Sequence, residues 1–192
     1  MSKILQFKIS LKGSRPLIWR RFQADDILKF YDLHLIIQTL MGWENIHLYQ
    51  FVYKKYSYIG NPELLEDDET IDDKKIKLSD IFDKPKTSVS YEYDFGDDWQ
   101  HKVQLEKILE KDPKQYYPVC IKGAFNCPPE DCGGIEGFYE LLEIVQDRNN
   151  PDYEDSREWL GEYYDPEYFN LDLINESLQS YKDTDPGLIK IS

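Results

Sequence analysis

The segment Ser88–Ile108 constrains the fold most, because large apolar side chains alternate with polar ones on both sides of a turn signal. The residues of the apolar parity are Val89, Tyr91, Tyr93, Phe95, Trp99, His101, Val103 and Leu105. A period of two is expected of a half-buried strand, so the pattern predicts a β-hairpin. A three-residue loop at 96–98 would pair Phe95 with Trp99 and Tyr93 with His101, which keeps the apolar groups on one face.

Other elements follow from apolar spacing and turn residues. Period-two patterns predict strands at 3–12, 17–23 and 43–53. Helical spacing, including Leu33/Ile36/Ile37/Leu40 before Gly42, predicts helices at 33–40, 78–82, 138–145, around Trp159 and at 171–178. Asp172 is available as a cap for the last helix. The acidic segment 60–77 is expected to be a surface loop, and 111–135 to lack regular structure.

The order of these elements predicts an α+β fold with a mixed, mostly antiparallel sheet packed by helices. Strand, strand, helix, strand at the start is typical of a β-grasp-like N-terminal half, whereas the C-terminal half is largely helical. A chain of 192 residues suits one domain, 1–192. Its parts are a sheet-rich half, 1–110, and a Pro/Gly/Cys loop followed by helices, 111–192.

The net charge limits the classes of partner that the chain can bind. The formal net charge of −14 disfavours broad electrostatic binding to nucleic acid or anionic lipid. Residues 1–60 nevertheless carry 9 Lys and Arg against 4 Asp and Glu, which keeps a DNA-associated accessory role as a minority hypothesis. Arg20 and Arg21 would make its anion contacts; the alternative is an edge strand with solvated charges covering Trp19.

No apolar run approaches the roughly 20 residues that span a bilayer, so no membrane partner is expected. Three cysteines, an odd number, without an export signal favour reduced thiols and a cytoplasmic location.

Cysteine spacing suggests a metal site. Cys120, Cys127 and Cys132, with His101 as a fourth ligand, would bind zinc, although Cys-x6-Cys-x4-Cys is looser than paired Cys-x2-Cys modules. Zinc would hold a Pro/Gly-rich segment that has no other regular structure. The alternatives are three buried, reduced thiols acting as small apolar groups, with His101 hydrogen-bonded in the core, or a disulfide.

Acidic residues form the second candidate site. Asp94, Asp97 and Asp98 surround the hairpin turn, and Glu130 and Asp131 lie in PPEDCGG. If the two segments touch, their carboxylates would bind Mg²⁺ or Mn²⁺ for hydrolase or nuclease chemistry, or act as a general acid and base. The alternative is that these acids only bond local backbone amides in turns. Both candidate sites require the DFGDDW turn and PPEDCGG to touch.

The third hypothesis is recognition of another protein without chemistry. Fifteen Tyr, four Trp and an acidic C-terminal half suit a surface with aromatic anchors, whose charge selects a basic partner. This binding role ranks first, ahead of enzymatic activity.

Six motifs occur in an order typical of one family: PLIWRR, LHLIIQTLMGWENIHLYQF, YEYDFGDDWQHKVQLEKIL, YPVCIKG, CPPEDCGG and EWLGEYYDPEYFNLDLIN. Across nearly the whole chain, the sequence resembles the plasmid pRiA4b open-reading-frame-three-like family, also described as an insertion-sequence passenger resembling TnpR. The resemblance implies an α+β domain carried on plasmids or mobile elements, and no particular activity. TnpR would suggest a resolvase, but the acidic chain has no recognisable helix-turn-helix tail and no serine nucleophile in a basic setting.

Overall fold

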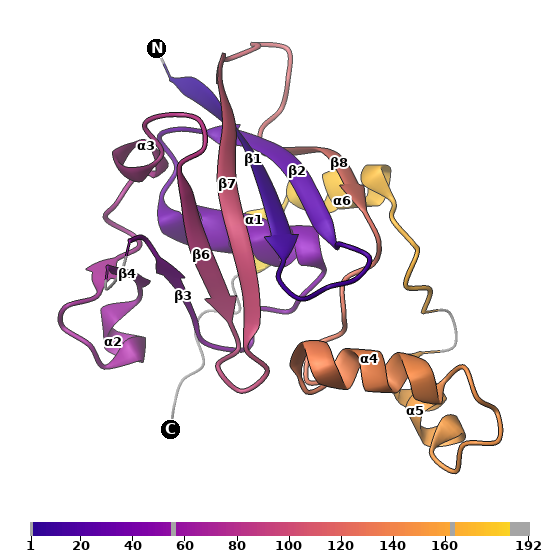
Figure 1. Ribbon diagram of the computed structural model, residues 1–192. Helices are drawn as coiled ribbons and strands as arrows, with labels where there is room; N and C mark the ends of the chain where they lie inside the picture. Colours follow the sequence, from indigo (N-terminus) through magenta and orange to yellow (C-terminus); the bar gives the residue numbers. More distant parts are fainter. Residues whose placement is uncertain (1, 55–56, 162–163, 185–192) are drawn as a thin grey trace.

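The computed structural model describes residues 2–54, 57–161 and 164–184, in which a mixed sheet is packed by helices (Figure 1). The strands are β1 (Lys3–Leu11), β2 (Trp19–Asp25), β3 (Tyr49–Val52), β4 (Tyr58–Gly60), β5 (Ile71–Asp72), β6 (Ser88–Tyr93), β7 (Trp99–Glu110) and β8 (Val119–Ala124). Their order in the sheet is β5-β4-β3-β6-β7-β1-β2-β8. Every neighbouring pair is antiparallel except β4 and β5. The predicted α+β class is confirmed.

The helices are α1 (Phe30–Met41), α2 (Pro62–Leu65), α3 (Leu78–Ile81), α4 (Gly134–Ile144), α5 (Tyr153–Leu160) and α6 (Leu171–Leu178), followed by a 3-10 turn at Tyr181–Thr184. Helix α1 ends as predicted: Gly42 is left-handed, with φ of 77°, and its N–H donates to the Gln38 carbonyl at 2.9 Å. Helix α6 is capped by Asn170, whose side chain accepts from the amides of Asp172 and Leu173, so Asp172 is not its cap.

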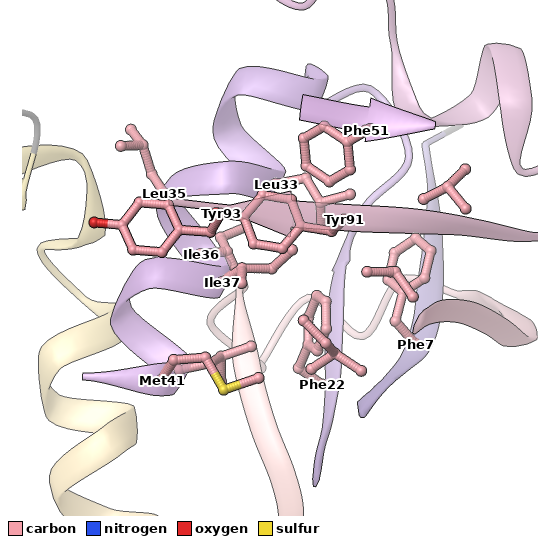
Figure 2. Packing of buried hydrophobic residues seen from close by; sticks show 14 of the residues in the cluster. Phe7, Phe22, Leu33, Leu35, Ile36, Ile37, Met41, Phe51, Tyr91 and Tyr93 are labelled. Atoms are coloured by element: carbon pink, nitrogen blue, oxygen red, sulfur yellow. The ribbon is translucent and has the colours of Figure 1, made fainter. Parts of the chain in front are cut away.

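The core lies between one face of the sheet and α1. Phe7 of β1 stacks on Phe22 of β2, with ring centroids 5.3 Å apart, and Tyr91 of β6 lies beside Phe51 of β3 (Figure 2). These side chains are buried, since they fall on the inward parity of each strand. The opposite parity of the same strands carries residues such as Arg21, Gln23, Gln104 and Glu106. This alternation is what an antiparallel sheet covered on one face requires.

The β6–β7 hairpin forms, but its register differs from the prediction by two residues. Tyr93 pairs with Trp99 and Tyr91 pairs with His101, so the turn comprises residues 94–98. Phe95 leaves the ladder and is 42% exposed. A shift of two preserves the face of every side chain, which is why alternation alone does not distinguish the two registers.

Two segments expected to lack structure contribute to the sheet. Val119–Ala124 forms the edge strand β8, and part of segment 60–77 forms α2 and β5. Because β8 pairs with β2, the strand that carries Arg20 and Arg21 is internal and not an edge strand. The predicted strand at 43–53 is shorter, since only Tyr49–Val52 pairs.

Helices α4 and α5 extend away from the sheet, beside the end at which the β6–β7 turn lies (Figure 1). Within the described residues, we find no helix that combines the length and apolarity needed to cross a bilayer.

Candidate metal site at the hairpin turn

The turn between β6 and β7 aims one carboxylate oxygen out of the loop. Asp94 is left-handed, with φ of 55°, and its Oδ1 accepts from the Gly96 amide at 2.9 Å. Asp98 is also left-handed, and its N–H donates to the Asp94 carbonyl at 2.7 Å. Aspartate tolerates this conformation because its short side chain bonds nearby backbone. The second Asp94 oxygen, Oδ2, is left to face His47.

The PPEDCGG segment packs directly against this turn, as the sequence analysis required. Asp97 Oδ2 accepts from the Gly133 amide at 3.2 Å. The Tyr93 hydroxyl donates to Glu130, whose other oxygen accepts from the Glu44 amide at 2.7 Å. Burial and the neighbouring Glu130 carboxylate raise the pKa of Tyr93, so it remains a hydrogen-bond donor at neutral pH.

A histidine that the sequence analysis did not single out completes the cluster. His47 Nε2 lies 3.1 Å from Asp131 Oδ1 and 3.6 Å from Asp94 Oδ2. The Nε2 atom is buried and has no partner with hydrogen-bond geometry among the described residues. One donor atom from each of the three side chains lies within 4.8 Å of the other two. The cluster of His47, Asp94 and Asp131 is called the HDD site below.

The HDD site is closed on the protein side and open on the other. The Asp94 side chain is 11% exposed and that of His47 26%, whereas that of Asp131 is 61% exposed. One imidazole nitrogen and two carboxylate oxygens are donors that Zn²⁺, Mn²⁺ and Fe²⁺ accept. A metal ion held by these three side chains would keep coordination positions for water on its solvent-facing side, as in catalytic rather than structural zinc sites.

The five predicted acids therefore have different roles. Asp94 and Asp131 supply donor atoms, while Asp97 and Glu130 hold the two loops together. Asp98 lies outside the cluster, and its Oδ1 accepts from the Gln100 side chain at 2.6 Å.

The three cysteines and His101 do not converge. Within the described part of the chain, no three of these four residues bring donor atoms within 4.8 Å of one another. His101 is fully buried, its Nδ1 lies 3.0 Å from the Trp99 carbonyl, and burial lowers its pKa to about 4.

Burial also keeps the thiols protonated. It raises the pKa of Cys120 to about 11 and that of Cys132 to about 12, and it raises the pKa of Cys127 as well. Hydrogen bonds, rather than thiolate ligands, secure this segment. Asn175 bonds both the amide and the carbonyl of Cys120, and the Tyr164 hydroxyl donates to the Cys127 carbonyl.

Arg20 and Arg21 do not form an anion-binding patch. The Arg20 guanidinium is buried and donates to the carbonyls of Trp19, Leu40 and Ala124. Arg21 makes a bidentate ion pair with Glu106, with N–O distances of 2.6 and 2.8 Å. Both guanidinium groups therefore bond to other groups of the fold: Arg20 to backbone carbonyls and Arg21 to a carboxylate.

The sequence alone does not identify His47 as a site residue, because its position beside Asp94 depends on strand pairing. It shares a parity with Tyr49, and Tyr49 pairs with Tyr93 across β3 and β6. Continuing this ladder by two residues places His47 beside the β6–β7 turn and Asp94. Knowledge that β3 pairs with β6 would have revealed the site, but no local pattern does.

Comparisons with known proteins agree with the fold. A family model described as "Plasmid pRiA4b ORF-3-like protein" matches residues 3–173. The chain is similar to the "Uncharacterized protein y4hQ" of Sinorhizobium fredii, with 29% identity over 93% of this chain and 92% of that protein. It is also similar to the crystal structure of a "Protein of Unknown Function MM3350" from Methanosarcina mazei Go1, at 41% identity and a TM-score of 0.82. That match covers 90% of this chain and 97% of the other.

Proposed function

The chain belongs to the plasmid pRiA4b ORF-3-like family, and we propose that it binds a divalent metal ion at the HDD site and uses it for hydrolysis. One observation carries the proposal: His47 Nε2, Asp94 Oδ2 and Asp131 Oδ1 converge, and the nitrogen is buried without a hydrogen-bond partner among the described residues. A buried polar atom without a well-aligned hydrogen bond is costly, and a metal ion would satisfy it together with both carboxylates.

The open side of the site favours chemistry over a purely structural role. His47, Asp94 and Asp131 would hold the ion, and a Zn²⁺ with three protein ligands would supply Lewis-acid activation of a water near neutral pH. The exposed Asp131 edge would leave the ion open to a substrate. Zinc remains the first candidate metal, with a different ligand set from the cysteines, and Mn²⁺ is the second.

Charge argues for a substrate that is not a nucleic acid. The protein carries a formal charge of −14, and two of the three metal ligands are acidic. Phosphodiester backbones bind through several Lys and Arg contacts, and both candidate arginines are used inside the fold. Among metal-dependent reactions, hydrolysis of a neutral or cationic substrate is therefore favoured over nuclease activity.

Metal titration of chelator-treated protein tests the proposal. We expect Zn²⁺ to bind with about one equivalent, and Asp131→Asn to weaken binding at least tenfold by removing a ligand charge. Asp131 is exposed, so this variant leaves the core intact. Turnover of ester and amide substrates by the zinc-loaded protein is then compared between the wild type and Asp131→Asn.

Two controls make the result specific. Asp98→Asn removes the same charge from the neighbouring turn without touching the HDD site, and should leave the affinity unchanged. A variant with all three cysteines changed to serine should also bind zinc, because the thiols do not converge. Equal affinity in wild type and Asp131→Asn, or loss of binding only in the cysteine variant, would reject the HDD site.

A protein-binding role is the second candidate, and the α4–α5 region supports it. Trp159 is 50% exposed on a segment rich in Asp and Glu, as expected of an anchor for a basic partner. Co-purification from the native host tests this role. The cytoplasmic location stays a prediction from the sequence.

A further inference from the structure

A hollow on the helical lobe formed by α4 and α5 shares one lining residue, Asp131, with the HDD site. Its volume is about 260 Å³, and its lining includes Asp131, Gly137, Glu140, Leu141, Ile144 and Trp159. Asp131 is shared with the HDD site, so a molecule seated in the hollow would lie beside the proposed metal ion.

The wall of the hollow is one face of α4. Gly137, Glu140, Leu141 and Ile144 are spaced i, i+3, i+4 and i+7, which places them in one row along the helix. Gly137 lies against the Cys132 carbonyl, where an added Cβ would stand 2.0 Å from the oxygen. Leu141 and Ile144 are half-buried, so the wall is apolar with one carboxylate, that of Glu140.

The far side of the hollow is an exposed tryptophan. Trp159 of α5 is 50% exposed, although it is the largest apolar side chain of the lobe. Tryptophan is the preferred aromatic partner of cations and is enriched among residues that dominate binding energies. An indole beside an apolar wall and a carboxylate can bind a long side chain that ends in a positive charge.

The charge around the hollow is predominantly negative. Residues 134–160 contain eight Asp and Glu against two Arg. None of the eight carboxylates takes part in an ion pair with any residue that the structure describes. A lobe of this composition attracts cationic partners and repels phosphate and other anions.

We propose that this hollow binds a lysine or arginine side chain of a peptide, and that such a basic peptide is the ligand presented to the metal ion. Presentation of the peptide to the metal ion rests on the proposed function, whereas binding of the basic side chain in the hollow does not. The aliphatic stem packs on Leu141, and the positive head group lies between the Glu140 carboxylate and the Trp159 ring. The peptide backbone then lies toward Asp131.

The dimensions agree with this orientation. From Gly137 to Ile144 the α4 axis advances roughly 10 Å, enough for an extended Lys or Arg side chain with room for the backbone at one end. Long basic side chains bury their methylene stems on apolar surface while the charge stays near water, as this open hollow allows. An acidic or purely apolar side chain would leave Glu140 repelled or unpaired.

Binding of fluorescein-labelled hexapeptides, measured by fluorescence anisotropy on the full chain, tests the proposal. A peptide of alternating Lys and Ala should bind, and the same peptide with Glu in place of Lys should not. Trp159→Ala and Glu140→Gln should each weaken binding five- to tenfold, as expected for a cation–π contact and a charge pair at an anchor. Glu154→Gln is the matched control, since it removes one exposed charge of α5 outside the hollow and should change the affinity less than twofold.

Zinc affinity is measured on the same variants, because neither Glu140 nor Trp159 belongs to the HDD site. Peptide binding with loss at Trp159 and Glu140 supports the hollow even if zinc does not bind; in that case only the metal proposal fails. Zinc binding without any difference between the Lys and Glu peptides overturns the proposal, as does equal loss in Glu154→Gln. A concentration-dependent dimer that Trp159→Ala abolishes would identify a second copy as the occupant and also overturn it.

Discussion

The Asp97 carboxylate accepts a hydrogen bond from the backbone amide of Gly133, which lies 3.2 Å away and 36 residues later in the chain. This contact joins the β6–β7 turn to the loop that carries Asp131. Gly134 extends the contact, because its Cα lies close against the Asp97 carbonyl. The position of one proposed metal ligand thus depends on a turn that supplies another.

Replacing Asp97 should weaken metal binding although Asp97 is not a ligand. Asp97→Ala removes the bond that positions the Asp131 loop, and loss of such a supporting contact lowers metal affinity about 10- to 100-fold. Asp98→Ala, one residue along the same turn, should have little effect. Zinc affinity by calorimetry checks both. Equal affinities would mean that the loop is held without Asp97.

Gly134 and Gly133 offer a matched pair for testing the close approach of the two loops. Both are left-handed, with φ of 69° and 83°. A Cβ at Gly134 would stand 2.2 Å from the Asp97 carbonyl oxygen, whereas at Gly133 the nearest atom is 3.6 Å away. Gly133→Ala should cost about 1–2 kcal/mol of backbone strain, and Gly134→Ala a further ~1–3 kcal/mol for the clash. Urea unfolding measures the difference; equal losses would exclude a tight contact.

His101 should make the protein less stable in mild acid. Burial lowers its pKa to about 4, below the value near 6.5 of an unfolded histidine, so the unfolded state binds more protons between these values. Stability is therefore highest above about pH 6.5 and falls toward pH 4, by about 3 kcal/mol from this group. His101→Gln removes the titration, and urea unfolding at several pH values should give a flatter profile. The same slope in both proteins would contradict the prediction.

The Arg21–Glu106 pair should stabilise the outer face of the sheet near neutral pH. Its bidentate bond to Arg21 lowers the pKa of Glu106, so the stabilisation is present above the unfolded value, near 4.3, and is lost as pH falls through the folded value. Glu106→Gln should cost about 1 kcal/mol at pH 7, since both side chains are partly exposed. The deficit should shrink below about pH 4. Glu92→Gln, which loses no ion pair, is the control in the same unfolding series.

Local patterns predicted much of the fold. Alternation in Ser88–Ile108 predicted the hairpin, and the i, i+3, i+4 spacing up to Leu40 predicted α1 and its end at Gly42. They did not predict β8, because its six residues gain strand structure only by pairing with β2 beside a Pro/Gly-rich loop. They also missed the hairpin register, since both alternatives place the same residues inward.

The sequence by itself determined which residues face the core and which residue types carry charge, because strand and helix periods are properties of the local chain. It also named Asp94 and Asp131 as candidate ligands, on the condition that their loops touch. Only the tertiary structure decided that His47 joins them, that the cysteines and His101 stay apart, and that Arg20 is buried. These long-range contacts depend on strand order and loop packing. Short-range periodicity carries no information about which distant segments become neighbours.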